Sequence, residues 1–188
     1  MLLLYIVVVC YVATASCSIE VLAYSAYGDS CTPNVAEGHV KLNGVAVWQG
    51  SWCGRLPNPR GVNILLVDPF SCSVQESRRF DTHLLTSAAT ELSNYLQLVN
   101  HGSIIVGVSA DAPRMRLDNA LSTLRHFGVE VSDLQNRGSF GFIAQKGFPA
   151  KTVLRKVLTE AESRYNPGQF NATITGIQFT VRSTYNCY

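Results

Sequence analysis

The sequence lacks the short motifs on which most enzymes build an active site. It contains no GxSxG nucleophile turn, no HExxH metal-binding pair, and no GxxxxGK or GxGxxG phosphate-binding loop. Its four histidines each stand alone in the chain, and isolated histidines are usually structural. These absences argue against an enzyme, and we predict a non-enzymatic protein with no catalytic residues, no metal site and no cofactor.

Charge is also scarce. Charged residues make up 15% of the chain and the formal net charge is only +2. Proteins that bind nucleic acid present a clustered basic face, so this composition excludes a nucleic-acid partner. By contrast, 47% of the 188 residues are hydrophobic, which is enough to bury the core of one globular domain.

Long apolar runs are missing except at the start. Residues 2–9, LLLYIVVV, are too short to span a bilayer but have the length of a signal-peptide core. The small residues Ala13 and Ala15 predict cleavage before Ser16, so residues 1–15 form a signal peptide. A later cleavage site and an uncleaved signal anchor are the alternatives. We therefore predict a secreted, extracellular protein with no membrane span after signal removal and a single domain over residues 16–188.

The cysteines lack any CxxC spacing, which argues against zinc and thioredoxin-like chemistry. In a secreted protein, scattered cysteines normally form disulfides. Five remain after cleavage: Cys17, Cys31, Cys53, Cys72 and Cys187. Because five is odd, one is free, pairs between chains, or is lost through a later cleavage. The tripeptide Asn171-Ala172-Thr173 is an N-glycosylation sequon and fits a secreted product.

Hydrophobic periodicity predicts an α+β domain. Asn43-Gly44 is a strong hairpin signal between two short alternating arms. Strands are predicted at 19–27, 39–48 (two arms), 63–67, 74–80, 103–109, 139–144 and 172–181. Helices are predicted at 88–99, 118–127 and 151–162. The order along the chain, with strands first and then strands mixed with helices, favours a mainly antiparallel sheet.

Two aspartates end the arms of the hairpin RGVNILLVDPFSCSVQESRRFDT. Asp68 precedes a proline turn, where an aspartate accepts bonds from its own backbone. An antiparallel return pairs residues near Val67 and Val74, which leaves Asp68 and Asp81 at opposite ends. A glycosidase-like carboxylate pair is therefore not expected here.

The candidate binding residues are Arg60, Asp111 and Arg137, each next to a predicted strand end. Recognition groups collect in such loops on a rigid scaffold. The arginines can donate to sugar hydroxyls and the carboxylate can accept, while Phe140 or Trp52 would add a stacking face. A solvated ion pair between loops is the alternative reading of the same residues.

An ordered set of motifs resembles the ILEI/PANDER-like family, also called the GG domain. The set comprises RGVNILLVDP with RRFDT, then GSIIVGV, then RGSFGFIAQKG, and IEVLAYSAYG is similar to the family's first strand. The resemblance spans about residues 19–147. It implies a compact, secreted, non-enzymatic module of two sheets with about three short helices, a β-sandwich-like α+β fold.

The resemblance also implies a function. Family members include cytokine-like proteins and a lectin-like stem of a glycosyltransferase, in which two arginines and an aspartate contact sugar. These map on Arg60, Asp111 and Arg137. The tryptophans of that stem are replaced here, with Phe140 at the strand position. The implied partner is a glycan, a GlcNAc-like sugar recognised through the strand-end loops, or a cell-surface receptor.

The cytokine-like members further imply a disulfide between Cys17 and Cys187. A second bridge would then join Cys31 to Cys53, which flank the first hairpin. On this assignment Cys72 is left over.

Overall fold

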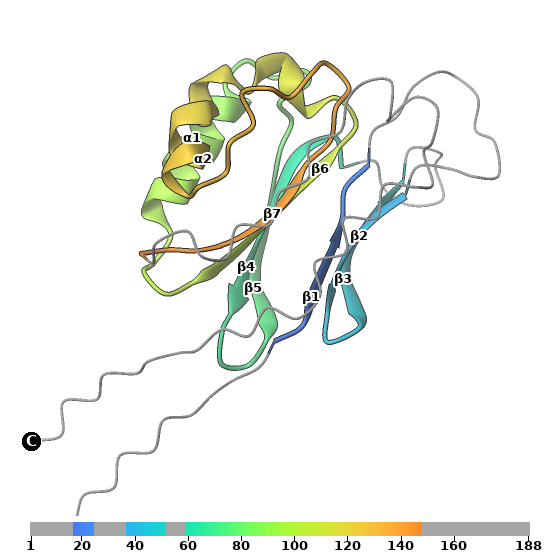
Figure 1. Ribbon diagram of the computed structural model, residues 1–188, viewed down its shortest axis with the longest axis vertical. Coiled ribbons are helices and arrows are strands. Elements are labelled where there is room, and N and C mark those ends of the chain that lie inside the picture. The colour runs from blue at the N-terminus through green and yellow to red at the C-terminus, as the bar shows by residue number, and fades with distance from the viewer. Residues whose placement is uncertain (1–16, 25–36, 52–58, 148–188) are drawn as a thin grey trace, which may run out of the picture.

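The computed structural model describes residues 17–24, 37–51 and 59–147, which form three layers (Figure 1). A four-stranded sheet lies in the middle, with helices on one face and a three-stranded sheet on the other. Several predictions concern residues outside the described part: the signal peptide 1–15, the helix 151–162, the strand 172–181 and the sequon at Asn171.

The middle sheet has the strand order β5-β4-β6-β7 and is antiparallel throughout. Its strands are β4 (Gly61–Asp68), β5 (Ser73–Phe80), β6 (Ile104–Ala110) and β7 (Gly141–Gln145). Every residue of β6 is buried, and so is every residue of β4 except the last. Both strands read as continuous apolar runs because both faces of this sheet are covered.

The smaller sheet has the order β1-β2-β3 and consists of β1 (Ile19–Leu22), β2 (Glu37–Leu42) and β3 (Val45–Ser51). The β2–β3 turn confirms the hairpin predicted from Asn43-Gly44. Both turn residues have positive φ, 49° and 81°. The tight primed turn requires this conformation, and asparagine and glycine adopt it at low cost.

The helical layer contains α1 (Ala88–Leu98), the 3₁₀ turns η1 (Pro113–Arg116) and η2 (Asp118–Ala120), and α2 (Leu121–His126). Helix α1 matches its prediction and begins after Ser87, although no side-chain cap bond forms there. The helix expected at 118–127 is shorter, because the Ala120 N–H bonds the Leu117 carbonyl and starts the segment as a 3₁₀ turn.

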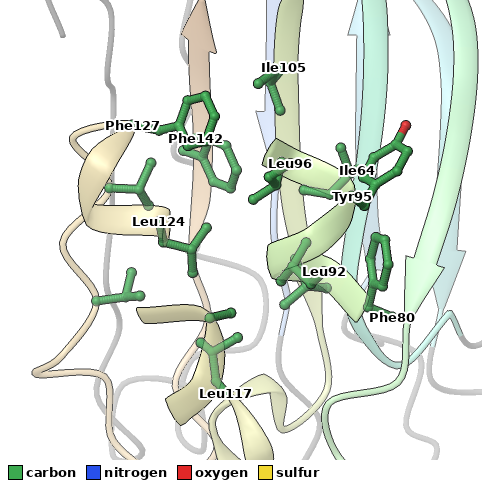
Figure 2. Close-up of a cluster of buried hydrophobic side chains, with 14 of the residues drawn as sticks. Ile64, Phe80, Leu92, Tyr95, Leu96, Ile105, Leu117, Leu124, Phe127 and Phe142 are labelled. Atoms are coloured by element: carbon green, nitrogen blue, oxygen red, sulfur yellow. The ribbon is translucent and has the colours of Figure 1, made fainter. Parts of the chain in front are cut away.

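Two apolar cores flank the middle sheet. On the helix face, Ile64 and Ile105 pack with Leu92 and Leu96 of α1, as Figure 2 shows. On the opposite face, the β4 and β6 residues adjacent in sequence to Ile64 and Ile105 pack against β1. Alternate side chains thus enter different cores, as the period of two in a strand requires. The α+β, two-sheet, mainly antiparallel architecture predicted from the sequence is confirmed.

The predicted partner of Cys17 is wrong. Cys17 forms a disulfide with Cys72, with the Cα atoms 5.4 Å apart, so it is not available to Cys187 and Cys72 is not left over. Cys17 precedes β1 and Cys72 lies in the β4–β5 turn, and these ends of the two sheets meet (Figure 1). The proposed bridge between Cys31 and Cys53 lies outside the described residues.

Candidate functional site

Strand register brings two of the predicted binding residues to one edge of the middle sheet. Gly61 of β4 pairs with Ala110 of β6 in antiparallel register. Arg60 directly precedes β4 and Asp111 directly follows β6, so both residues leave the sheet at this edge. The sheet itself therefore fixes their proximity.

The loop before β7 brings Arg137 to the same edge. The Ser109 N–H donates to the Phe140 carbonyl at 2.9 Å, and the Phe140 N–H donates to Ser109 Oγ at 2.7 Å. These bonds extend the β6–β7 contact beyond the ladder. They hold the loop close enough for Arg137 Nη1 to donate to Asp111 Oδ1 at 3.4 Å.

Arg60 engages a second carboxylate. Its Nη2 donates to Asp81 Oδ2 at 3.1 Å, and Asp81 Oδ1 accepts from the Leu84 N–H at 3.1 Å. Burial on its own would raise the pKa of Asp81. The bonds from Arg60 and Leu84, together with the positive charges of Arg60 and Arg79, outweigh burial and hold that pKa below its ordinary range.

At Asp111 the pKa shifts in the opposite direction, because burial has the larger effect. Its side chain is only 3% exposed, and burial raises its pKa above the ordinary range. Arg137, His83, the Ala112 N–H and Arg60 all act in the other direction without cancelling that effect. Both arginines of the predicted trio therefore act electrostatically on the same buried carboxylate.

The backbone is unusual at two of the three residues. Asp111 has φ of 55° and Arg137 has φ of 64°. Residues other than glycine rarely adopt this left-handed region, which costs about 1–3 kcal/mol when the surroundings impose it. Such conformations cluster at functional sites, and here both occur at one edge of one sheet.

Two further residues, Asp81 and His83, belong with Arg60, Asp111 and Arg137 in one cluster and were not predicted from the sequence. Asp81 was assigned only as the end of a hairpin arm, yet it is the hydrogen-bonded partner of Arg60. His83 acts electrostatically on Asp111, and its carbonyl accepts a bond from Arg116 Nε at 3.3 Å. The contact of Asp81 with Arg60 follows from the β4–β5 register, which places Phe80 opposite Val62.

Asp68 is a turn cap, as predicted. Its Oδ1 accepts from the N–H groups of Phe70 and Ser71 at 2.7 and 2.8 Å. Val67 pairs with Val74, so Asp68 and Asp81 lie at opposite ends of the hairpin.

Phe140 is not a stacking surface. It is completely buried and stacks on Phe142, with ring centroids 6.3 Å apart. It belongs to the core between the sheet and the helices. The other proposed stacking residue, Trp52, lies outside the described residues.

Within the described ranges, no group of three or more histidine, cysteine, aspartate or glutamate side chains is arranged to hold a metal ion. The same residues include no helix of the length and apolarity that crossing a membrane requires. The cluster is thus a set of charged hydrogen-bonding groups, which can donate through the guanidiniums and accept through the carboxylates.

Comparison with known families identifies one domain. Residues 60–148 match the family model described as "ILEI: Interleukin-like EMT inducer", which confirms the resemblance drawn from the motifs. The match begins at Arg60 and includes Asp111 and Arg137. No curated protein matches the chain.

Proposed function

Because residues 60–148 form an interleukin-like EMT inducer domain, we propose that this is a secreted, non-enzymatic binding protein that recognises a glycan. The binding residues in this proposal are Arg60, Asp111 and Arg137. The assignment follows from the motif positions of the family resemblance, and the arrangement of the three side chains supports it.

The observation that carries the proposal is the convergence of three residues far apart in sequence. They come from three different loops and gather at one edge of a buried, rigid sheet, two of them with left-handed backbone. An incidental surface ion pair does not require strained backbone on both partners. A rigid scaffold that presents polar groups from its loops is the usual construction of a recognition site.

The chemistry suits hydroxylated ligands. Guanidinium groups donate several hydrogen bonds in a fixed plane, and a carboxylate accepts without donating. The side chains of Arg60 and Arg137 are 27% and 30% exposed, so a ligand in solution can reach both.

A second candidate function follows from the family description, which is interleukin-like. In this alternative the protein is a signalling ligand for a cell-surface protein receptor. The two ion pairs are then structural, since each arginine already engages a carboxylate of its own chain.

A glycan array distinguishes the two functions. We expect the wild-type protein to bind one class of glycan and Arg137→Ala to lose that signal. Arg125→Ala is the matched control, because Arg125 pairs with Glu130 in an exposed contact outside the cluster. Absence of binding, or binding unchanged in Arg137→Ala, contradicts the glycan proposal. Cell binding that survives glycosidase treatment supports a protein receptor.

A further inference from the structure

Burial separates the two signs of charge in the Arg60–Asp111–Arg137 cluster. The carboxylates are inside: the side chain of Asp81 is 8% exposed and that of Asp111 is 3% exposed. The side chains of Arg60 and Arg137, which bond these carboxylates, are more exposed, at 27% and 30%. A ligand arriving from solvent therefore meets positive charge before it meets a carboxylate.

Two more arginines add to this charge. Arg79, exposed on β5, is close enough for its charge to lower the pKa of Asp81. Arg116, exposed at the end of η1, donates from Nε to the His83 carbonyl at 3.3 Å. Neither arginine has a carboxylate within ion-pair distance among the described residues.

Neighbouring basic residues do not all contribute. Arg114 forms an ion pair with Asp118 at 2.6 Å, so its charge is compensated locally. Among the described residues, two arginines (Arg60 and Arg137) bond the two buried carboxylates, Arg79 acts electrostatically on Asp81, and Arg116 bonds the carbonyl of the nearby His83. Local positive charge thus exceeds local negative charge, although the whole chain carries a net charge of only +2.

The contact of Arg60 also leaves hydrogen-bonding capacity. Nη2 donates to Asp81 and Nε is buried without an acceptor among the described residues, so Nη1 is the nitrogen left to donate to a ligand. A hydrogen bond from a guanidinium is stronger when the acceptor oxygen carries a negative charge. The hydroxyls of a neutral sugar also accept from guanidiniums, but these bonds are weaker than those to a carboxylate or a sulfate, and the acceptor Asp111 is only 3% exposed.

We propose that the site takes an acidic sugar, one that carries a carboxylate or a sulfate ester, in preference to a neutral one. This inference rests on the proposed glycan-binding function and specifies its ligand class. The buried carboxylates fix the two central arginines in place, and the exposed Arg79 and Arg116 attract the anion. Attraction between exposed charges of this kind weakens with salt over a Debye length of about 8–10 Å.

The test compares three oligosaccharides of equal length by calorimetry on the full chain. The first contains a uronic acid, the second is its carboxyl-reduced neutral form, and the third carries sulfate esters. We expect an acidic form to bind at least about tenfold more tightly than the neutral form, and the difference to shrink as salt rises. Tighter binding of either acidic form than of the neutral form supports the inference, and the comparison of the two acidic forms identifies the anionic group.

Variants that remove one charge identify which arginines cause the preference for the acidic form. Arg79→Gln and Arg116→Gln should each weaken binding of the acidic form and leave the weaker neutral binding unchanged. Lys41→Gln is the matched control, because it removes the same charge from the smaller sheet, where Lys41 pairs with Glu20. An equal loss in Lys41→Gln overturns the inference, since the effect would then be one of net charge.

The outcomes separate the inference from the function on which it rests. Equal affinity for the neutral and acidic forms overturns the preference for acidic sugars and leaves glycan binding intact. Binding to none of the three oligosaccharides, together with an empty glycan array, overturns both.

Discussion

Cys17 and Cys72 join the two sheets at one end of the molecule. Their disulfide connects the residue before β1 to the tight β4–β5 turn, 55 positions later in the chain. Next to it, the Ser18 N–H donates to Asn43 Oδ1 at 3.0 Å and the Asn43 N–H donates to the Ser18 carbonyl at 2.8 Å. The start of β1 is thus fixed covalently to one sheet and by hydrogen bonds to the other.

We expect removal of this bridge to destabilise the fold. Closing a loop of this length contributes about 4 kcal/mol by restricting the unfolded chain. The double variant Cys17→Ser, Cys72→Ser should therefore lose a few kcal/mol of unfolding free energy in urea. In reductant, wild-type protein and the variant should unfold at the same urea concentration. A non-reducing peptide map that links Cys17 to Cys187 contradicts the assignment.

The disulfide also illustrates what sequence can and cannot predict. The Asn43-Gly44 hairpin, the buried strand at 63–67 and helix α1 were predicted because their signals are local. The partner of Cys17 depends on which ends of two separate sheets meet, and nothing near Cys17 in the chain encodes that. The family resemblance supplied a partner, and for this chain it was the wrong one.

The candidate site likewise combines features that local sequence predicts with contacts that it does not. Arg60, Asp111 and Arg137 were predicted as candidates because each flanks a recognisable strand. Asp81 was missed as a partner of Arg60 because their contact depends on the register of β4 with β5, which shifts between Leu66 and Val67. Local patterns identify candidates, whereas the long-range register decides which of them touch.

Asp81→Asn should destabilise the protein at neutral pH. The carboxylate accepts from Arg60 and from the Leu84 N–H, and its pKa is lowered in the fold from an ordinary value of 3.8. A lowered pKa gives stability that is present above the unfolded-state pKa and lost as pH falls through the folded-state pKa. We expect a loss of about 1–3 kcal/mol at pH 7.

The pH profile checks this assignment. Unfolding free energies measured from pH 7 to pH 2 should show wild type and Asp81→Asn converging in acid. Asp118→Asn is the control, because that side chain is 70% exposed and its ion pair should contribute less than about 1 kcal/mol. A difference between wild type and Asp81→Asn that persists at pH 2 would mean that the charge of Asp81 is not the cause.

Asp111→Asn should have the opposite effect. Burial raises the pKa of Asp111, so the folded state binds the proton more tightly than the unfolded state. Stability is then greatest below the ordinary pKa of 3.8 and falls as pH rises through the folded-state pKa. Asparagine also tolerates the left-handed backbone at this position.

We therefore expect Asp111→Asn to match wild type in acid and to gain about 0.5–2 kcal/mol at pH 7. Thermal and urea unfolding at both pH values measure the gain. If the residue contacts glycan, the same variant should lose binding while it gains stability. A variant that is less stable at pH 7 would indicate that the ion pair with Arg137 is structural.

Gly61, directly after Arg60, lies against the backbone of β5 at a position that has no room for a side chain. It has φ of 99°, and a Cβ there would lie 2.1 Å from the Phe80 carbonyl oxygen, which is backbone and cannot move aside. Gly61→Ala should therefore cost more than about 3 kcal/mol, from backbone strain and overpacking together. Gly44→Ala is the matched control, with φ of 81° and nothing within 4 Å of the added carbon. It should cost only the conformational strain, about 1–2 kcal/mol. Equal losses of unfolding free energy in the two variants would show that the close approach of β5 to Gly61 adds nothing to the backbone strain.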